Sequence, residues 1–316
     1  GGGNAAGGGG PAAANERLLP DTPLDLAALN SVDAKIELDA AALKSRGLAV
    51  GNLKLVASLD HGTLDVGTLN ATLEGGTLTS TTLLESRATP PHLRTRTNLK
   101  GIALARFFAG NKSISAPSGH ADVAIDLDGR GKSVAALLGG ANGRMQVSAS
   151  SLELANKSAN FAGGDLLTQL LSMLNPMSKR SDHTTVECAV VNFPVTQGRM
   201  ENKTGLGMRT DQMTILGGGS IDLASEKLDI GATPKPRSGI GLNLAGLADF
   251  VRLGGTLANP TPVTDTAGAA SAGLKIGAAI ATGGISVLAD SLLKRSEGDL
   301  DVCAIARGDQ PPPDAK

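Results

Sequence analysis

Short runs in which apolar residues occupy every second position recur along most of this chain, and they constrain its fold more than any other feature. In the first run, apolar and polar residues alternate from Val32 to Leu38. Such alternation places apolar side chains on one face of a β-strand and polar side chains on the other. Similar runs follow up to about Lys100, separated by short turns such as Asp60-His61-Gly62. Turns this short join antiparallel neighbours, so the pattern predicts a meander with one apolar face.

The strand pattern continues through the second half of the chain, with helical interruptions. Alternation resumes near Ala121 and again after Val186. Between strands, Ser133 to Leu138 carries apolar residues at helical spacing, which predicts one or two helical turns. The triplet Gly217-Gly218-Gly219 lies between strand-like segments and predicts a bulge or a turn. The expected fold class is mainly β with accessory helices.

Composition and periodicity divide the chain into five parts. The leucine stripe of residues 164–175 predicts an amphipathic helix that Pro176 ends. It is either a lid packed on the apolar face of the sheet or a membrane-surface helix, although its polar face is nearly neutral. The expected parts are a flexible Gly/Ala-rich linker at 1–23, an antiparallel meander at 24–135, a second β region at 136–262 that contains this helix, an Ala/Gly-rich helical tail at 263–307 and a disordered end at 308–316.

The scarcity of aromatic side chains narrows the classes of partner. Hydrophobic residues make up 41% of the chain, yet it has no Trp, no Tyr and five Phe. Aromatic rings stack on bases and sugars, and 29 basic against 30 acidic residues leave no basic excess for phosphates, so we expect no nucleic-acid partner. Aliphatic surfaces suit acyl chains, which offer only dispersion and apolar area. A GC-rich genome would also enrich Ala, Gly, Leu and Val.

The common catalytic templates are missing from the sequence. It has no Gly-x-Ser-x-Gly elbow, no His-Glu-x-x-His pair and no phosphate-binding Walker loop. The four histidines lie far apart: His61, His92, His120 and His183. We therefore expect a protein that is not an enzyme and uses neither a metal nor a cofactor. An enzyme with an unrecognised site is the remaining alternative.

Several segments resemble a known family in their order along the chain. Leu137 to Met145 reads as a small helix running into a strand, and Val186 to Thr233 combines a cysteine, a Phe-Val strand, a Gly turn, a Gly-rich bulge and an "IDL" segment. The run Gly254 to Pro260 precedes the tail in the manner of a "G-T-x-x-x-P" exit. This order is similar to the C-terminal region of AsmA-family proteins, and the resemblance spans about Leu24 to Arg307.

The resemblance implies both an architecture and a role. It implies an extended, curved antiparallel sheet, a β-groove or taco-like shape with an apolar interior. It also implies a periplasmic location, an inner-membrane anchor in residues upstream of this sequence, possible outer-membrane contact and a part in outer-membrane biogenesis. The expected function is shielding or transfer of phospholipid or another membrane lipid along the groove. The alternative is an assembly factor that contacts outer-membrane proteins through a strand edge, without lipid.

The strand alternation selects the side chains expected to line the inner face of this groove. For each of them, ordinary core packing under a helix is the alternative. The candidates are Ile36, Leu38, Leu53, Leu55, Leu64, Val66, Leu69, Leu73, Val123, Ile125, Val147, Val190, Ile215, Ile221 and Ile230.

The chain has two cysteines, Cys188 in a predicted strand and Cys303 near the C-terminus. In an extracytoplasmic protein such a pair suggests a disulfide, which would tie the helical tail to the sheet. Two unpaired core thiols are the alternative.

Overall fold

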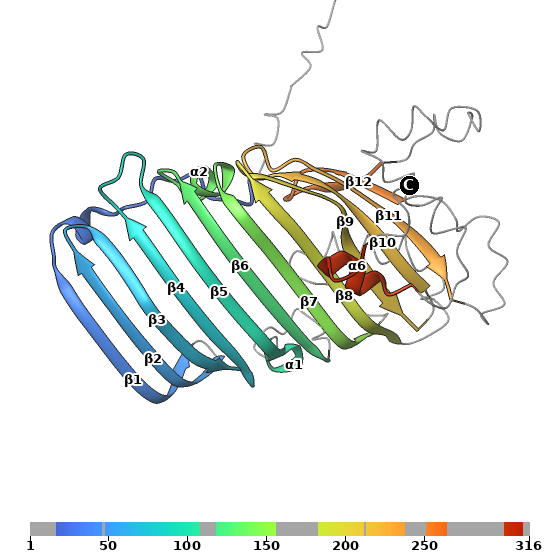
Figure 1. Cartoon of the computed structure of the whole chain (residues 1–316), viewed down its shortest axis with the longest axis horizontal. Helices are drawn as coiled ribbons and strands as arrows, with labels where there is room; N and C mark the ends of the chain where they lie inside the picture. The colour runs from blue at the N-terminus through green and yellow to red at the C-terminus, as the bar shows by residue number, and fades with distance from the viewer. Residues whose placement is uncertain are drawn as a thin grey trace, which may run out of the picture.

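A single antiparallel sheet forms the body of the protein. The computed structural model describes residues 17–45, 48–107, 118–155, 183–211, 213–237, 251–263 and 300–311. In these ranges thirteen strands form one sheet whose spatial order is the sequence order (Figure 1). The mainly β fold predicted from the alternation is therefore confirmed, and the meander continues without a break across the expected boundary between residues 135 and 136.

The elements have the following bounds. The strands are β1 (Ala34–Ser45), β2 (Leu48–Asp60), β3 (Thr63–Leu73), β4 (Gly76–Glu85), β5 (His92–Ala103), β6 (His120–Arg130), β7 (Asn142–Ala155), β8 (His183–Thr196), β9 (Arg199–Thr210), β10 (Met213–Asp222), β11 (Leu228–Pro236), β12 (Val251–Gly255) and β13 (Pro260–Pro262). The short helices of the described ranges are η1 (Ala27–Asn30), α1 (Leu104–Phe107), α2 (Val134–Gly139) and α6 (Val302–Arg307).

Local sequence explains the turns and the main irregularity of the sheet. The β2–β3 turn places His61 at φ 47° and Gly62 at φ 80°, the two positive values that a tight type I′ hairpin turn requires. In β10 the pairing with β9 shifts between Gly217 and Gly219, so the predicted glycine bulge is confirmed. Ser133 caps α2 by accepting a hydrogen bond from the Ala136 N–H, as its sequence position suggests.

Strand register gives the sheet one aliphatic face. Residues directly opposite each other in antiparallel strands share a face, and Ile36 opposes Ala57, which in turn opposes Val66. Following these pairs across the sheet defines the apolar face. Beyond β3 it carries Leu78, Leu84, Leu93, Leu99, Val123, Ile125, Leu127, Met145, Val147, Val191, Phe193, Val195, Met200, Leu206, Met208, Ile215, Ile221, Leu228, Ile230 and Leu253.

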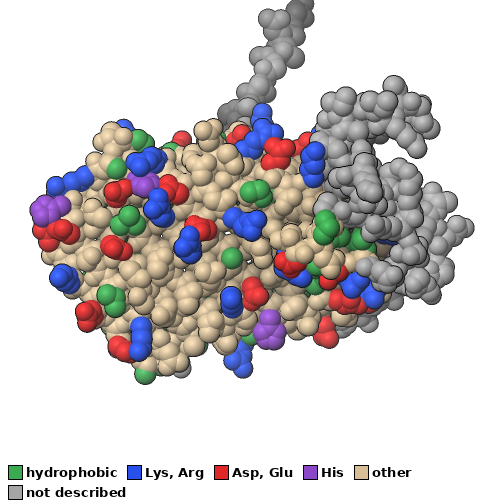
Figure 2. Space-filling model, in the orientation of Figure 1, with side chains coloured by type: hydrophobic (Ala, Val, Ile, Leu, Met, Phe, Trp, Pro, Cys, Tyr) green, Lys and Arg blue, Asp and Glu red, His purple; other side chains and the backbone are tan. Residues whose placement is uncertain are grey.

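The other side, here called the charged face, carries the polar residues of the same strands. Arg94 opposes Asp128 and Arg96 opposes Asp126 across β5 and β6, each pair joined by two hydrogen bonds. Figure 2 shows this face, with basic and acidic side chains spread over the strands. The sheet therefore separates an aliphatic side from a charged one.

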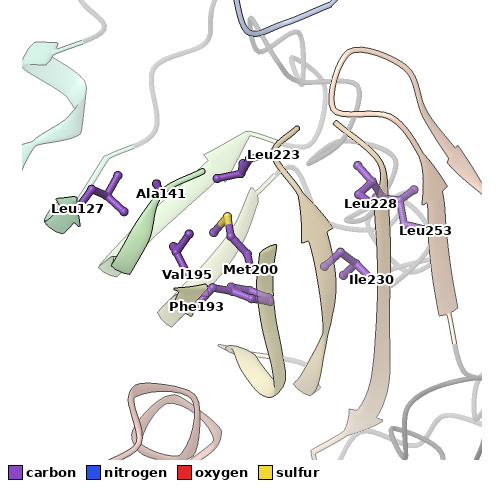
Figure 3. Close-up of a cluster of buried hydrophobic side chains, with 9 residues drawn as sticks. All are labelled: Leu127, Ala141, Phe193, Val195, Met200, Leu223, Leu228, Ile230 and Leu253. Atoms are coloured by element: carbon purple, nitrogen blue, oxygen red, sulfur yellow. The ribbon is translucent and has the colours of Figure 1, made fainter. Parts of the chain in front are cut away.

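At the C-terminal end of the sheet, the apolar face is buried. One buried cluster joins apolar-face residues of strands between β6 and β12 with Ala141 and Leu223 of the adjoining connections (Figure 3). Its members are Leu127, Ala141, Phe193, Val195, Met200, Leu223, Leu228, Ile230 and Leu253. These side chains lie on successive strands, and in Figure 1 the sheet bends at this end. The curvature expected from the family resemblance is present at this end.

Helix α6 covers part of the charged face at the same end. Val302, Ile305 and Ala306 of α6 pack in a second buried cluster with Val190 of β8 and Leu216 of β10. Asp301 caps the helix by accepting hydrogen bonds from the Cys303 and Ala304 N–H groups. In Figure 1 this short helix lies in front of β8.

The connections that join the strands at one of their two ends are hydrogen-bonded to one another. We call this row of connections the stitched rim. Backbone bonds of 2.8 to 2.9 Å join successive connections from the β2–β3 turn to the β10–β11 turn. They run from Ser86 N to Gly62 O, Gly131 N to Pro91 O, Gly198 N to Ala141 O and Leu223 N to Gly198 O. These bonds couple hairpins that would otherwise be held by strand pairing alone.

The segment 17–33, here called the strap, runs along the stitched rim to the start of β1. At its start, the Leu18 N–H donates to Glu226 in the β10–β11 turn. Next, Pro20 O accepts a hydrogen bond from the Ala135 N–H of α2, and at its far end Asn30 accepts one from Ser86 in the β4–β5 turn. Residues 17–23 were expected in the flexible linker. They form part of the folded body instead, because polar groups of the rim bind them.

The structure describes only some of the residues predicted to form the helix at 164–175, the helical tail and the disordered end. The helical tail is represented by α6, and residues 264–299 lie outside the described ranges, as does the predicted amphipathic helix 164–175. In the predicted disordered end, Gly308 is the C-cap of α6 and the Asp309 N–H donates to Ala304 O, while 312–316 are not described. Within the described part of the chain, no helix is long and apolar enough to cross a membrane.

Candidate functional site

The candidate site is the apolar face, because strand register brings nearly all predicted groove residues onto it. The exception is Val190. The residues that share the face are Ile36, Leu38, Leu53, Leu55, Leu64, Val66, Leu69, Leu73, Val123, Ile125, Val147, Ile215, Ile221 and Ile230. Sequence alternation identified them without knowledge of the bulges that keep them in phase.

The assignment of Val190 to the inner face is wrong. Val190 opposes Ser148 on the charged face and is buried beneath α6. Its neighbour Val191 opposes Val147 and lies on the apolar face. The error has a simple cause, since two adjacent valines are compatible with either phase of the alternation.

Exposure varies strongly along the apolar face. Ile36 and Leu38 on β1, and Val147 and Val191 on β7 and β8, are exposed. In contrast Ile215 retains 4% of its surface and packs with other aliphatic residues. The face is therefore open on β1 and again at Val147 and Val191, and it is packed core around Ile215 and Ile230, to which the core alternative applies.

A set of polar residues on the apolar face was missed by the sequence reasoning. Ser80 and Thr82 of β4 oppose Thr97 and Thr95 of β5. Ser80 Oγ lies 2.7 Å from Thr97 Oγ1, and Thr82 Oγ1 lies 2.9 Å from Thr95 Oγ1. The Thr-rich composition of this hairpin was the available signal, because a period of two places these hydroxyls in line with Leu78 and the other leucines.

On the charged face, His92 connects three strands at the stitched rim. Its side chain is almost buried, with one ring nitrogen beside Glu85 and the other 2.8 Å from Asp128 Oδ1. The bond from His92, and after it those from Arg94, hold the pKa of Asp128 below its ordinary value against the opposing effect of burial. This arrangement is structural, since all three partners already satisfy one another.

The strap is held by a buried carboxylate. Glu226 accepts hydrogen bonds from the Leu18 and Leu19 N–H groups and from Arg17 Nε, at 2.7 to 3.1 Å. Burial alone would raise the pKa of Glu226, but the bonds from Leu18, Arg17 and Leu19 outweigh it and keep the pKa below its ordinary value. The carboxylate therefore stays ionised in the folded protein at neutral pH.

Cys188 and Cys303 form a disulfide in this structure, with their Cα atoms 6.5 Å apart. The bond joins β8 to α6 on the charged face, as expected for a tail tied to the sheet. The disulfide therefore lies on the opposite side of the sheet from the apolar face.

Among the described residues, one set of side chains could hold a metal ion. The ligand atoms of Asp33, Asp60 and His61 lie within 4.8 Å of one another beside the β2–β3 turn. All three are exposed, and the Asp33 carboxylate already accepts a hydrogen bond from the His61 N–H. Exposed acidic groups of this kind are common without a metal, and the set is separate from the apolar face.

Comparisons with known proteins agree with the resemblance noted from the sequence. The model of the AsmA family matches residues 4–204. The AsmA family protein YhjG of Escherichia coli (strain K12) is 22% identical over 266 residues, which cover 81% of this chain and 36% of that protein. The chain thus spans little more than a third of the length of this relative. No solved structure matches.

Proposed function

Because this chain belongs to the AsmA family, we propose that it handles membrane lipid, with its apolar face holding acyl chains and its charged face meeting water. The observation that carries the proposal is the register that keeps aliphatic side chains in phase from β1 to β12. Ile36, Leu38, Val147 and Val191 are exposed on this face, and exposed aliphatic side chains that share a face are typical of a binding surface.

The chemistry of the face suits acyl chains. Aliphatic side chains stabilise a bound chain by about 25 cal/mol per Å² of apolar area removed from water, or roughly 0.8 kcal/mol per methylene. Along most of the face this attraction has no preferred position, so a chain can slide. The proposed role is passive binding and transfer, without catalysis or a cofactor.

The proposed location is the periplasm, in support of outer-membrane biogenesis. The Cys188–Cys303 disulfide supports it, because such bonds persist in oxidising compartments such as the periplasm.

A matched pair of substitutions tests whether the apolar face binds lipid. Ile36 and Val56 are equally exposed, at 48%, and lie on opposite faces of adjacent strands. Ile36→Asp places a carboxylate against the acyl chain, and we expect it to weaken lipid binding about tenfold or more. Val56→Asp should leave binding unchanged. The measurement is uptake of a fluorescent phosphatidylethanolamine from phosphatidylethanolamine/phosphatidylglycerol vesicles.

Val147→Asp extends the test to the middle of the sheet, where we expect a similar loss of binding. Circular dichroism melts of each variant check the fold. Equal uptake by wild type, Ile36→Asp and Val147→Asp would contradict the proposal. So would the absence of both co-purified lipid in native mass spectrometry and uptake from vesicles.

A second candidate function is strand addition at β1. This edge strand is twelve residues long and, among the described residues, pairs only with β2. An added strand from an outer-membrane protein would bond to its free backbone groups. Backbone recognition tolerates Ile36→Asp, so a partner captured equally by wild type and Ile36→Asp, without lipid uptake by either, would favour this alternative.

A further inference from the structure

The four hydroxyls on the apolar face form an isolated polar patch, here called the hydroxyl island. Ser80, Thr82, Thr95 and Thr97 face the same side as Val66 of β3. Besides the two short bonds across the strands, Thr95 Oγ1 lies 3.4 Å from Thr97 Oγ1 and 3.5 Å from Thr81 O. The four side chains are all half-buried.

Within the apolar face, aliphatic residues border the hydroxyl island both along and across the strands. Along the strands it lies between the cross-strand pairs Leu78–Leu99 and Leu84–Leu93. Across the strands its neighbours are aliphatic residues of β3 and β6. These are Val66 and Leu69 on β3, and Ile125 and Leu127 on β6. The described apolar-face positions of β3 to β6 include no charged side chain.

The island retains hydrogen-bonding capacity. Four hydroxyls carry four protons, and each of the two short bonds uses one of them. The other two protons have only the contacts of 3.4 and 3.5 Å within the described residues, which are long for an O–H donor. Covered by acyl chains alone, these donors would lose water without a full replacement.

We propose that the hydroxyl island binds the ester carbonyls of an acyl lipid whose chains lie on the flanking aliphatic residues. This inference rests on the proposed function and gives the lipid a preferred position on a face that is otherwise uniform. An ester carbonyl accepts hydrogen bonds, carries no charge and stands at the root of the acyl chains, so it matches donors that are ringed by aliphatic side chains.

The same surroundings disfavour charged groups at this position. A free fatty-acid carboxylate or a phosphate would lie among aliphatic side chains without a cation on that face of β3 to β6, and burying an unpaired charge is costly. A phosphate headgroup must therefore extend away from the island while the ester linkages contact it.

The test compares ester lipids with ether lipids, which lack the carbonyl acceptors. The probes are vesicles of a diacyl phosphatidylcholine and of the matching dialkyl ether phosphatidylcholine, presented to the whole chain. We expect wild type to bind the ester lipid more tightly, on the order of fivefold per hydrogen bond gained. Ser80→Ala/Thr82→Val/Thr95→Val/Thr97→Val removes the hydroxyls with little change of shape, and it should bind both lipids equally.

The matched control is Thr79→Val/Thr81→Val, which alters the same strand on the charged face and should keep the ester preference. If the fourfold variant does not fold, Ser80→Ala/Thr97→Val removes one hydrogen-bonded pair and should reduce the preference. Equal binding of ester and ether lipids by wild type, or an unchanged preference in a folded variant, overturns the inference alone. Failure of wild type to bind either lipid rejects the proposed function as well.

Discussion

At the scale of single residues, Glu226 connects parts of the chain that are far apart in sequence. It lies in the β10–β11 turn, is almost fully buried, and binds the beginning of the strap through Arg17, Leu18 and Leu19. An ionised carboxylate with three donors is stabilising, whereas the same group without them would be a buried, unpaired charge.

We predict that Glu226 makes stability depend on acidic pH. Because its pKa is lower in the folded than in the unfolded state, its contribution is complete above the unfolded value of about 4.3. It is lost as the pH falls through the folded-state pKa. Glu226→Gln should lower the free energy of unfolding by about 1–3 kcal/mol at pH 7 and flatten its decline in acid. Denaturant unfolding at several pH values measures both.

The control for this prediction is Glu201→Gln. Glu201 forms an ion pair with Arg199 on the surface, where both side chains are exposed. Its substitution should therefore change stability by less than about 0.5 kcal/mol. An equal effect of the two substitutions would show that burial of Glu226 adds nothing.

Residue-level prediction succeeded where the chain alternates strictly and failed where it does not. Ile36 and Leu38 could be assigned to a face because charged residues separate them. Val190 could not, because Val191 follows it and only the pairing with β7 fixes the phase. The hydroxyl island is invisible to a hydrophobicity pattern, since serine and threonine suit either face of a strand.

At the scale of elements, α6 depends on the sheet for its stability. The helix is six residues long, which is too short to be stable alone in water, and five of its residues are buried in the structure. Gly207 of β9 lets it approach, because a Cβ there would lie 2.3 Å from Val302 O. The disulfide adds a covalent link between this helix and β8.

We predict that Cys188→Ser/Cys303→Ser lowers the free energy of unfolding by up to about 5 kcal/mol, because the bond closes a loop between residues 115 positions apart. Hydrogen exchange should also become faster in α6 than in β8. Reducing agent should reproduce both effects in wild type and do nothing to the variant. Unchanged stability and exchange in the variant would mean that packing alone holds α6.

The sequence predicted a helical tail over residues 263–307 and a possible bond between its Cys303 and Cys188, which the structure contains. It did not indicate which face the helix covers. That depends on Gly207 of β9, which admits α6, and on Val190 and Leu216, which pack against it. Turns were easier to predict, since positive φ values at His61 and Gly62 follow from local sequence.

At the scale of the whole molecule, packing increases from the first strands to the last. No described side chain of β1 is buried, whereas β8 to β11 supply most of the three buried clusters. The open and closed ends of the apolar face thus belong to one sheet with unequal local stability. Sequence alternation predicted the sheet but not this gradient, which depends on which strands pack together in the buried clusters.

We predict that native-state hydrogen exchange follows this gradient, with β1 amides exchanging fastest and β8 to β11 amides slowest. Substitutions should follow it too. Ile36→Asp should change the free energy of unfolding by less than about 0.5 kcal/mol, and Ile230→Asp should cost more than about 4 kcal/mol. Uniform protection across the sheet would contradict the gradient.

The strap also determines how the protein would respond to force. Tension on the residues before Arg17 would reach the sheet first at Glu226, close to Leu223 and Leu228 of a buried cluster, rather than at the free edge of β1. Peeling β1 away strand by strand, the weakest way to pull a sheet apart, would begin only after that carboxylate had released its three donors. The attachment thus shields the open end of the apolar face from mechanical load.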